Sequence, residues 1–202
     1  MPADWRFLVV PSGIEADKAG GARDRYNRAS VATQVLYRLW TAAVGPAPSL
    51  AAALASGPGA VDTLQALIAG HRDPAFTAEE LAARLSHFRA EDARVPPARD
   101  AFAAGDVSRL GELAAASQAD AERWLGNQIP ETSALVRVLR ETGGFAASSF
   151  GAGFGGSVWA LAPAGEAVAI AEAAVTRYRA SRPHIGSVDW FSARPGPALV
   201  AL

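Results

Sequence analysis

Hydrophobic residues follow a strand-like pattern near the two ends of the chain and a helical period over most of the middle. The run Trp5-Arg6-Phe7-Leu8-Val9-Val10 is rich in aromatic and β-branched residues and stops at Pro11-Ser12-Gly13, which predicts a strand ending in a turn. Further short strands are predicted over about 145–150, 158–162, 188–192 and 198–202. Strands near both ends with helices between them indicate an α+β domain, in which an antiparallel sheet of about four strands packs against a layer of helices on one side.

Between these runs, apolar residues recur every three or four positions, which predicts helices. One helix begins at the capping box Thr77-Ala78-Glu79-Glu80 and is interrupted at Pro96-Pro97, after which a second stretch runs to Ala104. Ser108 is expected to cap the next helix, which closes at Gly126-Asn127. The other predicted helices cover about 17–43, 49–55, 60–69, 130–142 and 165–181.

Composition narrows the classes of function. The chain has 202 residues, half of them hydrophobic, which is enough for one ordinary domain or two small ones. Its formal charge of −1 gives no bulk attraction to nucleic acid or to an anionic membrane. No cysteine and only three scattered histidines argue against a disulfide framework and a metal centre. Because the start lacks a signal-peptide pattern and no apolar stretch approaches the ~20 residues that span a bilayer, we expect a cytoplasmic protein.

The segment Ser149-Phe150-Gly151-Ala152-Gly153-Phe154-Gly155-Gly156 is the strongest candidate for binding chemistry. Its glycines permit left-handed backbone conformations, and successive amides in such a loop can bind a phosphate. The spacing Gly151-x-Gly153-x-x-Gly156 also matches a dinucleotide fingerprint, but that motif requires a helix directly after it. Here Ser157-Val158-Trp159-Ala160-Leu161 indicates a strand, so we predict the tip of a hairpin. A glycine-rich structural turn without a ligand is the alternative.

Two further features have ordinary structural explanations. The predicted first helix begins with a run of charged residues between Glu15 and Arg28, and a run of this kind is usually a solvated face. His87 adjoins the apolar face of the helix that starts after Thr77. A lone histidine there is more often packed or hydrogen-bonded than catalytic.

Several separated blocks of sequence occur in an order that is typical of one enzyme family. They are Ser12–Gly20 with Tyr26-Asn27-Arg28, Arg84-Leu85-Ser86-His87 with Glu91 and Arg94-Val95, Gly105-Asp106, Leu110–Leu113, Ser117, Pro130-Glu131 and the glycine loop. The second block is similar to the motif R-x-x-H-x-x-x-E-x-x-R-V, and the loop to the third signature motif T-G-A-G-x-G-G, which lies on a hairpin. Over nearly its whole length the chain resembles the C-terminal half of a galactokinase, in the larger family of GHMP small-molecule kinases.

The resemblance implies a galactokinase-like C-terminal domain over residues 1–202, with a helical insertion over about 46–130. It implies phosphoryl transfer from ATP to a monosaccharide hydroxyl, with magnesium, in a cleft between two domains. Tyr26 lies where galactokinases place a tyrosine that contacts the sugar; the alternative is a surface tyrosine packed along its helix. The implied nucleotide and phosphate loop consists of Ser149, Gly151, Ala152, Gly153, Phe154, Gly155 and Gly156.

The same resemblance implies that one of the family's two domains is missing from this chain. The magnesium ligand, the catalytic aspartate and the family's first two motifs belong to an N-terminal GHMP domain that has no counterpart here. We therefore expect no catalytic or metal-binding residue in this chain, no tight binding of ATP or magnesium by the chain alone, and no activity without that domain. Its expected partners are the N-terminal domain and a monosaccharide, not nucleic acid or a membrane.

Some positions depart from the family pattern and leave the substrate open. Ser148 and Phe150 stand where a basic residue and a threonine are usual, Gln118 where a histidine follows Ser117, and Ser133 where an aspartate is frequent. A loop without its cation is expected to bind nucleotide weakly and to complete a site formed with another domain. A GHMP kinase for another sugar such as a heptose, or a non-catalytic binding or regulatory module that kept the fold, are the alternatives.

Overall fold

The computed structural model describes residues 1–16, 23–151 and 153–196, without the side chains of residues 23–26. The chain divides into two compact units. The first comprises Met1–Ala16, Pro96–Ala119 and Asn127–Leu202, and the second comprises Asp17–Val95 and Asp120–Gly126. The sheet and the glycine loop belong to the first unit, whereas the second unit is helical.

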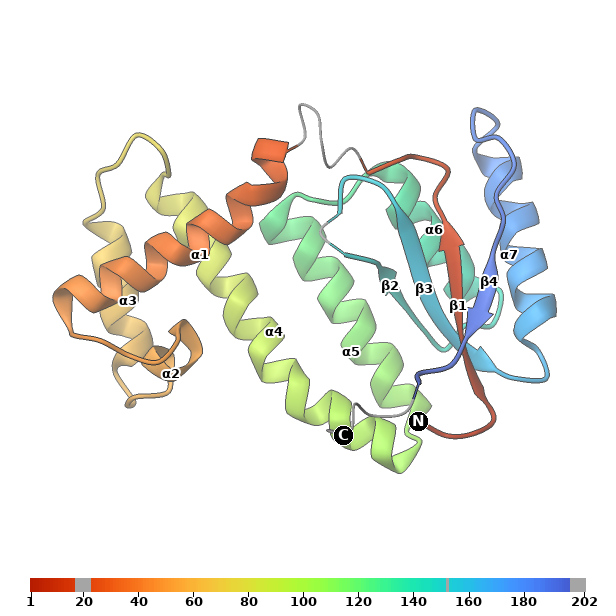
Figure 1. Cartoon of the computed structure of the whole chain (residues 1–202), viewed down its shortest axis with the longest axis horizontal. Helices are drawn as coiled ribbons and strands as arrows, with labels where there is room; N and C mark the ends of the chain where they lie inside the picture. Colours follow the sequence, from red (N-terminus) through yellow and green to blue (C-terminus); the bar gives the residue numbers. More distant parts are fainter. Residues whose placement is uncertain (17–22, 152, 197–202) are drawn as a thin grey trace, which may run out of the picture. The chain divides into compact units, whose positions relative to one another are not determined.

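The elements follow one another in an order that mixes helices and strands (Figure 1). The first unit contains β1 (Trp5–Pro11), α5 (Val107–Asp120), α6 (Pro130–Glu141), β2 (Ala146–Ser149), β3 (Ser157–Pro163), α7 (Ala167–Ser181) and β4 (Phe191–Ala193). The second contains α1 (Arg23–Ala43), α2 (Leu50–Leu54), α3 (Ala60–Ala69) and the π-helical turn η1 (Ala121–Leu125). Helix α4 (Ala78–Ala104) contributes residues to both units.

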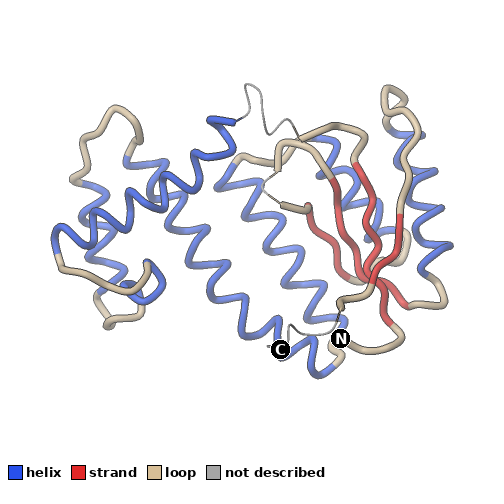
Figure 2. Tube along the Cα trace, in the orientation of Figure 1, coloured by secondary structure: helices blue, strands red, loops and turns tan. Residues whose placement is uncertain are grey.

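Four strands form one antiparallel sheet in the order β2-β3-β1-β4 (Figure 2). Strands β1 and β3 pair along their full lengths, from Trp5 opposite Pro163 to Pro11 opposite Ser157. Leu8 and Val10 of β1 and Val158 and Ala160 of β3 belong to one core, so a slip by one residue would move these side chains to the opposite face. The predicted α+β class with an antiparallel sheet of about four strands is confirmed.

Helices cover both faces of the sheet, whereas the sequence pattern predicted them on one side only. On one face Leu8, Val10 and Val158 pack in a core with α6 and α7. On the other face Trp5 and Leu161 pack with Ala101 of α4 and Leu110 of α5. The alternation in β1 explains the second layer, because its aromatic residues point opposite to Leu8 and Val10 and would otherwise be left in water.

The second unit has its own hydrophobic core. Buried residues of α1, α2, α3 and the N-terminal part of α4 form one cluster, which includes Leu36, Trp40, Leu64 and Leu81. The hydroxyl of Tyr37 also donates a hydrogen bond to the carbonyl oxygen of Ala47, at 2.5 Å. These helices therefore form a small bundle with internal packing of its own.

Two predicted helix boundaries are wrong. Helix α4 continues through Pro96 and Pro97, although two prolines remove two backbone donors. The carbonyls that lose these donors belong to the exposed residues Asp92 and Ala93, where water can replace the missing hydrogen bonds. Helix α5 is capped by Asp106, whose carboxylate accepts a hydrogen bond from the Arg109 amide at 2.9 Å, and not by Ser108.

The last predicted strands are only partly described. Strand β4 comprises Phe191–Ala193, so the predicted run 188–192 begins too early. Val188 is instead buried in the core on the side of α6 and α7. The predicted strand over 198–202 lies outside the described residues.

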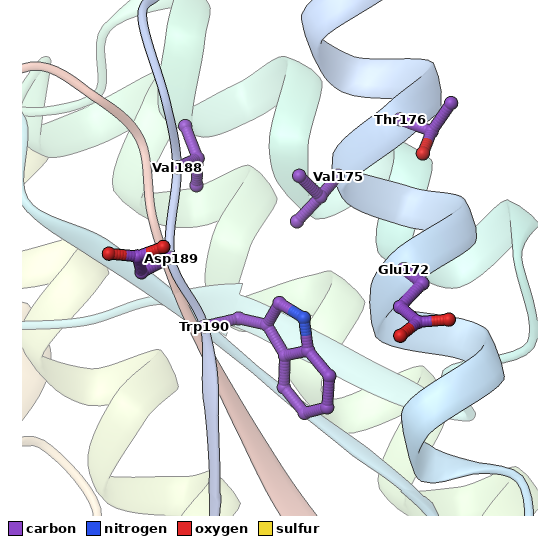
Figure 3. A pocket seen from close by; sticks show the side chains of 6 residues that line it. All are labelled: Glu172, Val175, Thr176, Val188, Asp189 and Trp190. Atoms are coloured by element: carbon purple, nitrogen blue, oxygen red, sulfur yellow. The ribbon is translucent and has the colours of Figure 1, made fainter.

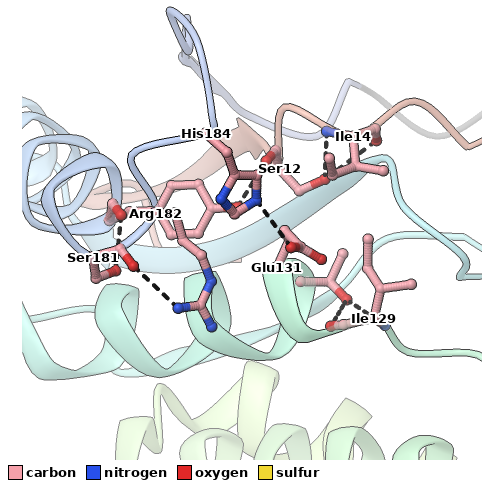
Figure 4. A network of polar contacts seen from close by, with 9 residues as sticks. Ser12, Ile14, Ile129, Glu131, Ser181, Arg182 and His184 are labelled. Carbon is pink, nitrogen blue, oxygen red and sulfur yellow. Dashed lines mark hydrogen bonds and ion pairs between the residues drawn. The ribbon is translucent and has the colours of Figure 1, made fainter.

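Tyr178 of α7 ties the helical layer to the end of β1. Its side chain is fully buried, and its hydroxyl donates to the carbonyl oxygen of Ser12 at 2.7 Å. Beside this contact, His184 approaches the carboxylate of Glu131, with 3.2 Å between Nε2 and Oε1 (Figure 4). Burial raises the pKa of Tyr178 to about 12, and the negative charge of Glu131 acts in the same direction. The hydrogen bond fixes the turn that follows β1 against α7.

The raised pKa predicts a loss of stability in alkali. An unfolded tyrosine ionises near pH 10, so above that pH the unfolded chain releases the proton that folded Tyr178 retains. The free energy of unfolding should therefore fall as the pH rises from about 10 towards 12. Tyr178→Phe should lower the free energy of unfolding by about 1 kcal/mol at pH 7. In this variant the free energy of unfolding should not show the same fall in alkali. Urea unfolding at several pH values would measure both, and identical alkaline slopes for the two proteins would contradict the assignment.

Close packing of α5 on the sheet predicts a second stability effect. A Cβ atom at Gly111 would overlap the carbonyl oxygen of Phe145. Gly111→Ala should therefore cost about 1–3 kcal/mol through overpacking. Gly165→Ala is the matched control, because a Cβ atom there has no neighbour within 4 Å. Thermal unfolding should show a lower Tm for Gly111→Ala than for the control, and equal Tm values would contradict the close approach.

Candidate functional site

The glycine loop is the tip of the hairpin that joins β2 to β3. Ser149 pairs with Val158, and the Phe150 amide donates to the carbonyl oxygen of Ser157 at 2.8 Å. On the other side, the Ser12 amide donates to the carbonyl oxygen of Gly156, also at 2.8 Å. The predicted hairpin is confirmed, and a strand rather than a helix follows the loop, which excludes the dinucleotide-binding arrangement.

The loop depends on left-handed backbone conformations. Gly151, Gly153, Gly155 and Gly156 all have positive φ angles, from 77° to 121°. Phe154 has a φ of 59° and is the non-glycine residue with a positive φ angle in the described part of the chain. Such a conformation is uncommon for a bulky residue and persists only where the surrounding structure holds it.

Two backbone carbonyls from other segments hold the loop in this shape. The Phe154 amide donates to the carbonyl oxygen of Asn127 at 2.6 Å, and the Gly156 amide donates to that of Ile14 at 2.8 Å. The approach is close, because a Cβ atom at Gly153 would overlap the Asn127 carbonyl and one at Gly155 would lie 2.8 Å from the Ile14 oxygen. Glycine is therefore required at these two positions for steric as well as conformational reasons.

Gln118 supports the start of the loop from α5. Its side chain is buried, and its Oε1 accepts hydrogen bonds from the Ser148 hydroxyl at 3.1 Å and from the Ser149 amide at 2.9 Å. The sequence pattern marked Gln118 and Ser148 only as departures from the family. In the structure the two residues are hydrogen-bonded, and the side-chain oxygen of Gln118 accepts the bond that the buried Ser148 hydroxyl donates.

These contacts divide the loop amides into two groups. The amides of Ser149, Phe150, Phe154 and Gly156 donate to protein acceptors. Within the described part of the loop, the amides of Gly151, Gly153 and Gly155 have no protein acceptor. Ala152, which was also predicted to line the site, lies outside the described residues. Gly151 is exposed, so its amide can be presented to a ligand, whereas Gly153 and Gly155 are buried among the contacts that fix the shape of the loop.

The remaining predicted site residue, Tyr26, belongs to the second unit. It lies in the first turn of α1, and its side chain is outside the described residues. Its contact with a sugar stays a prediction. Sequence reasoning did not identify Asn127 and Ile14 as supports of the loop, because a backbone carbonyl carries no side-chain signal.

His87 is hydrogen-bonded, as its position in the pattern predicted. Its Nδ1 lies 2.8 Å from Nη1 of Arg84, and both residues are partly buried in the second unit. Burial and the positive charge of Arg84 lower the pKa of His87. At neutral pH the imidazole is therefore uncharged and can accept a hydrogen bond from the guanidinium.

A separate cavity of about 450 Å³ lies between α7 and the segment before β4 (Figure 3). It is lined by Glu172, Val175, Thr176, Val188, Asp189 and Trp190. In Figure 3 the indole of Trp190 points towards α7, whereas Asp189 points away from it. The cavity includes no residue of the glycine loop, so it is distinct from the candidate site.

Two kinds of feature are absent from the described residues. Across residues 1–16, 23–151 and 153–196, no three side chains among histidine, aspartate and glutamate gather as a metal ion would require. In the same residues no helix has both the length and the hydropathy needed to cross a membrane.

Comparison with known proteins identifies kinases that are similar in sequence or in fold. Residues 98–180 match the family model described as GHMP kinases C terminal. The structure of Lactococcus lactis galactokinase in complex with galactose is similar over 95% of this chain, with a TM-score of 0.70 and 21% identity. L. major mevalonate kinase in complex with R-mevalonate is similar over 96%, with a TM-score of 0.51 and 18% identity. The chain spans 45% and 44% of those two chains.

The segment that matches the GHMP kinase model includes the glycine hairpin. Of the two solved structures described above, the galactokinase has the higher TM-score. The fold is thus that of a galactokinase-like C-terminal half.

The geometry of the loop predicts different effects for two glycine substitutions. Gly153→Ala should destabilise the chain by about 2 kcal/mol or more, because the methyl group would overlap the Asn127 carbonyl. Gly151→Ala meets no atom within 4 Å, so only its positive φ angle of 77° opposes the change, at a cost of about 1 kcal/mol. Urea unfolding measures the difference. A greater loss for Gly151→Ala would contradict the support from Asn127.

Proposed function

We propose that the chain is the C-terminal half of an ATP-dependent, galactokinase-like kinase that phosphorylates a monosaccharide hydroxyl. The observation that carries the proposal is the glycine hairpin, which is fixed by the backbone carbonyls of Ile14 and Asn127 and lies in the segment that matches the GHMP kinase model. The similarity to a galactokinase over 95% of the chain supports the choice of a sugar as substrate. The expected location is the cytoplasm.

The hairpin would act on the phosphates of ATP. Phosphoryl transfer depends mainly on positioning and on stabilising negative charge, and preorganised amide donors perform both tasks. The amide of Gly151 suits this role, because Gly151 is exposed and no acceptor in the described loop uses its amide, whereas Gly153 and Gly155 are buried. Since Ser148 is engaged by Gln118 and Phe150 is uncharged, the loop adds no cation of its own. It would complete a nucleotide site rather than form one.

The other requirements of the reaction would come from an N-terminal GHMP domain. A kinase of this class needs magnesium, whose positive charge neutralises the phosphates during transfer. In the part of the chain that the structure describes, no group of acidic side chains suits that ion. We therefore assign magnesium binding and the catalytic base to the partner domain, and we assign a sugar contact to Tyr26.

A two-part kinase assay tests the proposal. The 202-residue chain alone should show no turnover of ATP with galactose and magnesium. A complete protein, in which the proposed N-terminal GHMP domain accompanies this segment, should phosphorylate a monosaccharide. Tyr26→Phe in that complete protein should raise the KM for the sugar by about tenfold while leaving the KM for ATP nearly unchanged, because a lost sugar hydrogen bond is worth about 1.4 kcal/mol.

A substrate panel separates the alternatives. Galactose, its epimers, a heptose and mevalonate should be compared, and preference for galactose identifies a galactokinase. Preference for a heptose would identify a kinase for another sugar. Turnover by the 202-residue chain alone would overturn the assignment of the catalytic groups to a partner domain. If no upstream sequence encodes a phosphate-binding motif, the non-catalytic module becomes the better interpretation.

A further inference from the structure

The N-terminal part of α1 is held to α4 by one partly buried guanidinium. The Nε of Arg84 donates to the carbonyl oxygen of Ala29 at 3.1 Å and to the hydroxyl of Thr33 at 2.8 Å. The Thr33 hydroxyl in turn donates to the Ala29 carbonyl at 2.9 Å. All three residues belong to the second unit, and Ala29 lies three residues after Tyr26 in the same helix.

His87 orients this guanidinium from one turn further along α4. Arginine has only donors, so the 2.8 Å contact between Arg84 Nη1 and His87 Nδ1 requires the imidazole to accept. The imidazole is then neutral, with its proton on Nε2. Its neutral acceptor and the two acceptors on α1 together leave the guanidinium one orientation, which a flexible surface arginine would not have.

The charged residues around His87 act on its pKa in both directions. On α4, Arg84 and Arg94 oppose its protonation, whereas Glu91 favours it, and Asp120 at the end of α5 also favours it. Arg94 is paired with both Glu91 and Asp120. Because burial is the largest cause, the net effect lowers the pKa of His87 below its ordinary value of about 6.5. Mild acid should therefore remove the acceptor that orients Arg84.

We propose that Arg84 and His87 are positioning residues, which fix the first turns of α1 and through them the placement of Tyr26. We refer to the contacts among Ala29, Thr33, Arg84 and His87 as the α1 clamp. Arg28 makes a second link between these helices, through Glu80 at 2.6 Å and the Ala75 carbonyl at 2.9 Å, but that pair is half-exposed. Surface pairs contribute little, so the partly buried clamp carries most of the restraint. Its effect on catalysis rests on the proposed function, whereas its effect on α1 does not.

Hydrogen exchange on the 202-residue chain tests the clamp without any activity. Arg84→Ala should lower the protection of amides 27–33 by about tenfold or more, because the first turns of α1 open more often. Arg99→Ala is the control, since Arg99 lies on the same helix and its exposed side chain pairs with the exposed Asp100. Arg84→Lys should have an intermediate effect, because an ammonium group cannot reproduce the planar set of donors.

His87 variants test the orienting contact. His87→Gln keeps a neutral acceptor and should preserve protection at neutral pH, whereas His87→Phe should reduce it. Below about pH 6.5, protection in the original chain should fall as His87 gains a proton, while His87→Gln should show no such fall. If Arg84→Ala and His87→Phe both leave amides 27–33 as protected as the control does, the clamp is overturned. An effect of Arg84→Ala alone would overturn the role of His87.

Kinetics in the complete gene product test the link to the substrate. Arg84→Ala should raise the KM for the sugar by about tenfold or more with little change in the KM for ATP, whereas His87→Gln should leave both KM values close to those of the original protein. An equal rise in both KM values would contradict a specific effect on Tyr26. A complete protein with no kinase activity would instead overturn the proposed function, and the exchange experiment would still decide whether the clamp exists.

Discussion

The backbone carbonyls of Ile14 and Asn127 are the contacts on which the candidate site depends. They accept hydrogen bonds from the Gly156 and Phe154 amides, and they approach the loop so closely that side chains at Gly155 and Gly153 would collide with them. Neither carbonyl lies in the hairpin itself. Ile14 follows β1 and Asn127 precedes α6, so the loop has its shape only when the sheet and the helices around it are assembled.

The glycine loop has no charged side chain. Gln118 uses its side-chain oxygen to hold Ser148 and Ser149, and this places a neutral, satisfied pair where a cation is usual in the resembling family. The proposed anion contact of the loop would therefore rely on backbone N–H groups alone, in a site that another domain would begin. The hydrogen bond from the Tyr178 hydroxyl to the Ser12 carbonyl stabilises the turn that follows β1.

In the second unit, polar contacts supplement a hydrophobic core. The core residues of α1, α3 and α4 would hold the bundle together, but apolar packing is tolerant of small shifts. Hydrogen bonds from Arg84 to Ala29 and Thr33 have a defined geometry, so they restrict the rotation and translation of α1 more closely. Under the proposal, Arg84 and His87 would thus influence the sugar contact of Tyr26 without touching the sugar themselves.

The sequence by itself determined the class of the fold, most of its elements and the hairpin nature of the glycine loop. Period, capping and glycine spacing are local signals, and they are visible wherever one segment decides its own conformation, as at Pro130 and at the strand after Gly156. Only the tertiary structure decided that helices cover both faces of the sheet, that α4 passes through Pro96, and which loop amides are occupied. Each of these depends on a carbonyl, a solvent-exposed surface or a packed face supplied by a distant segment, and no local pattern carries that information.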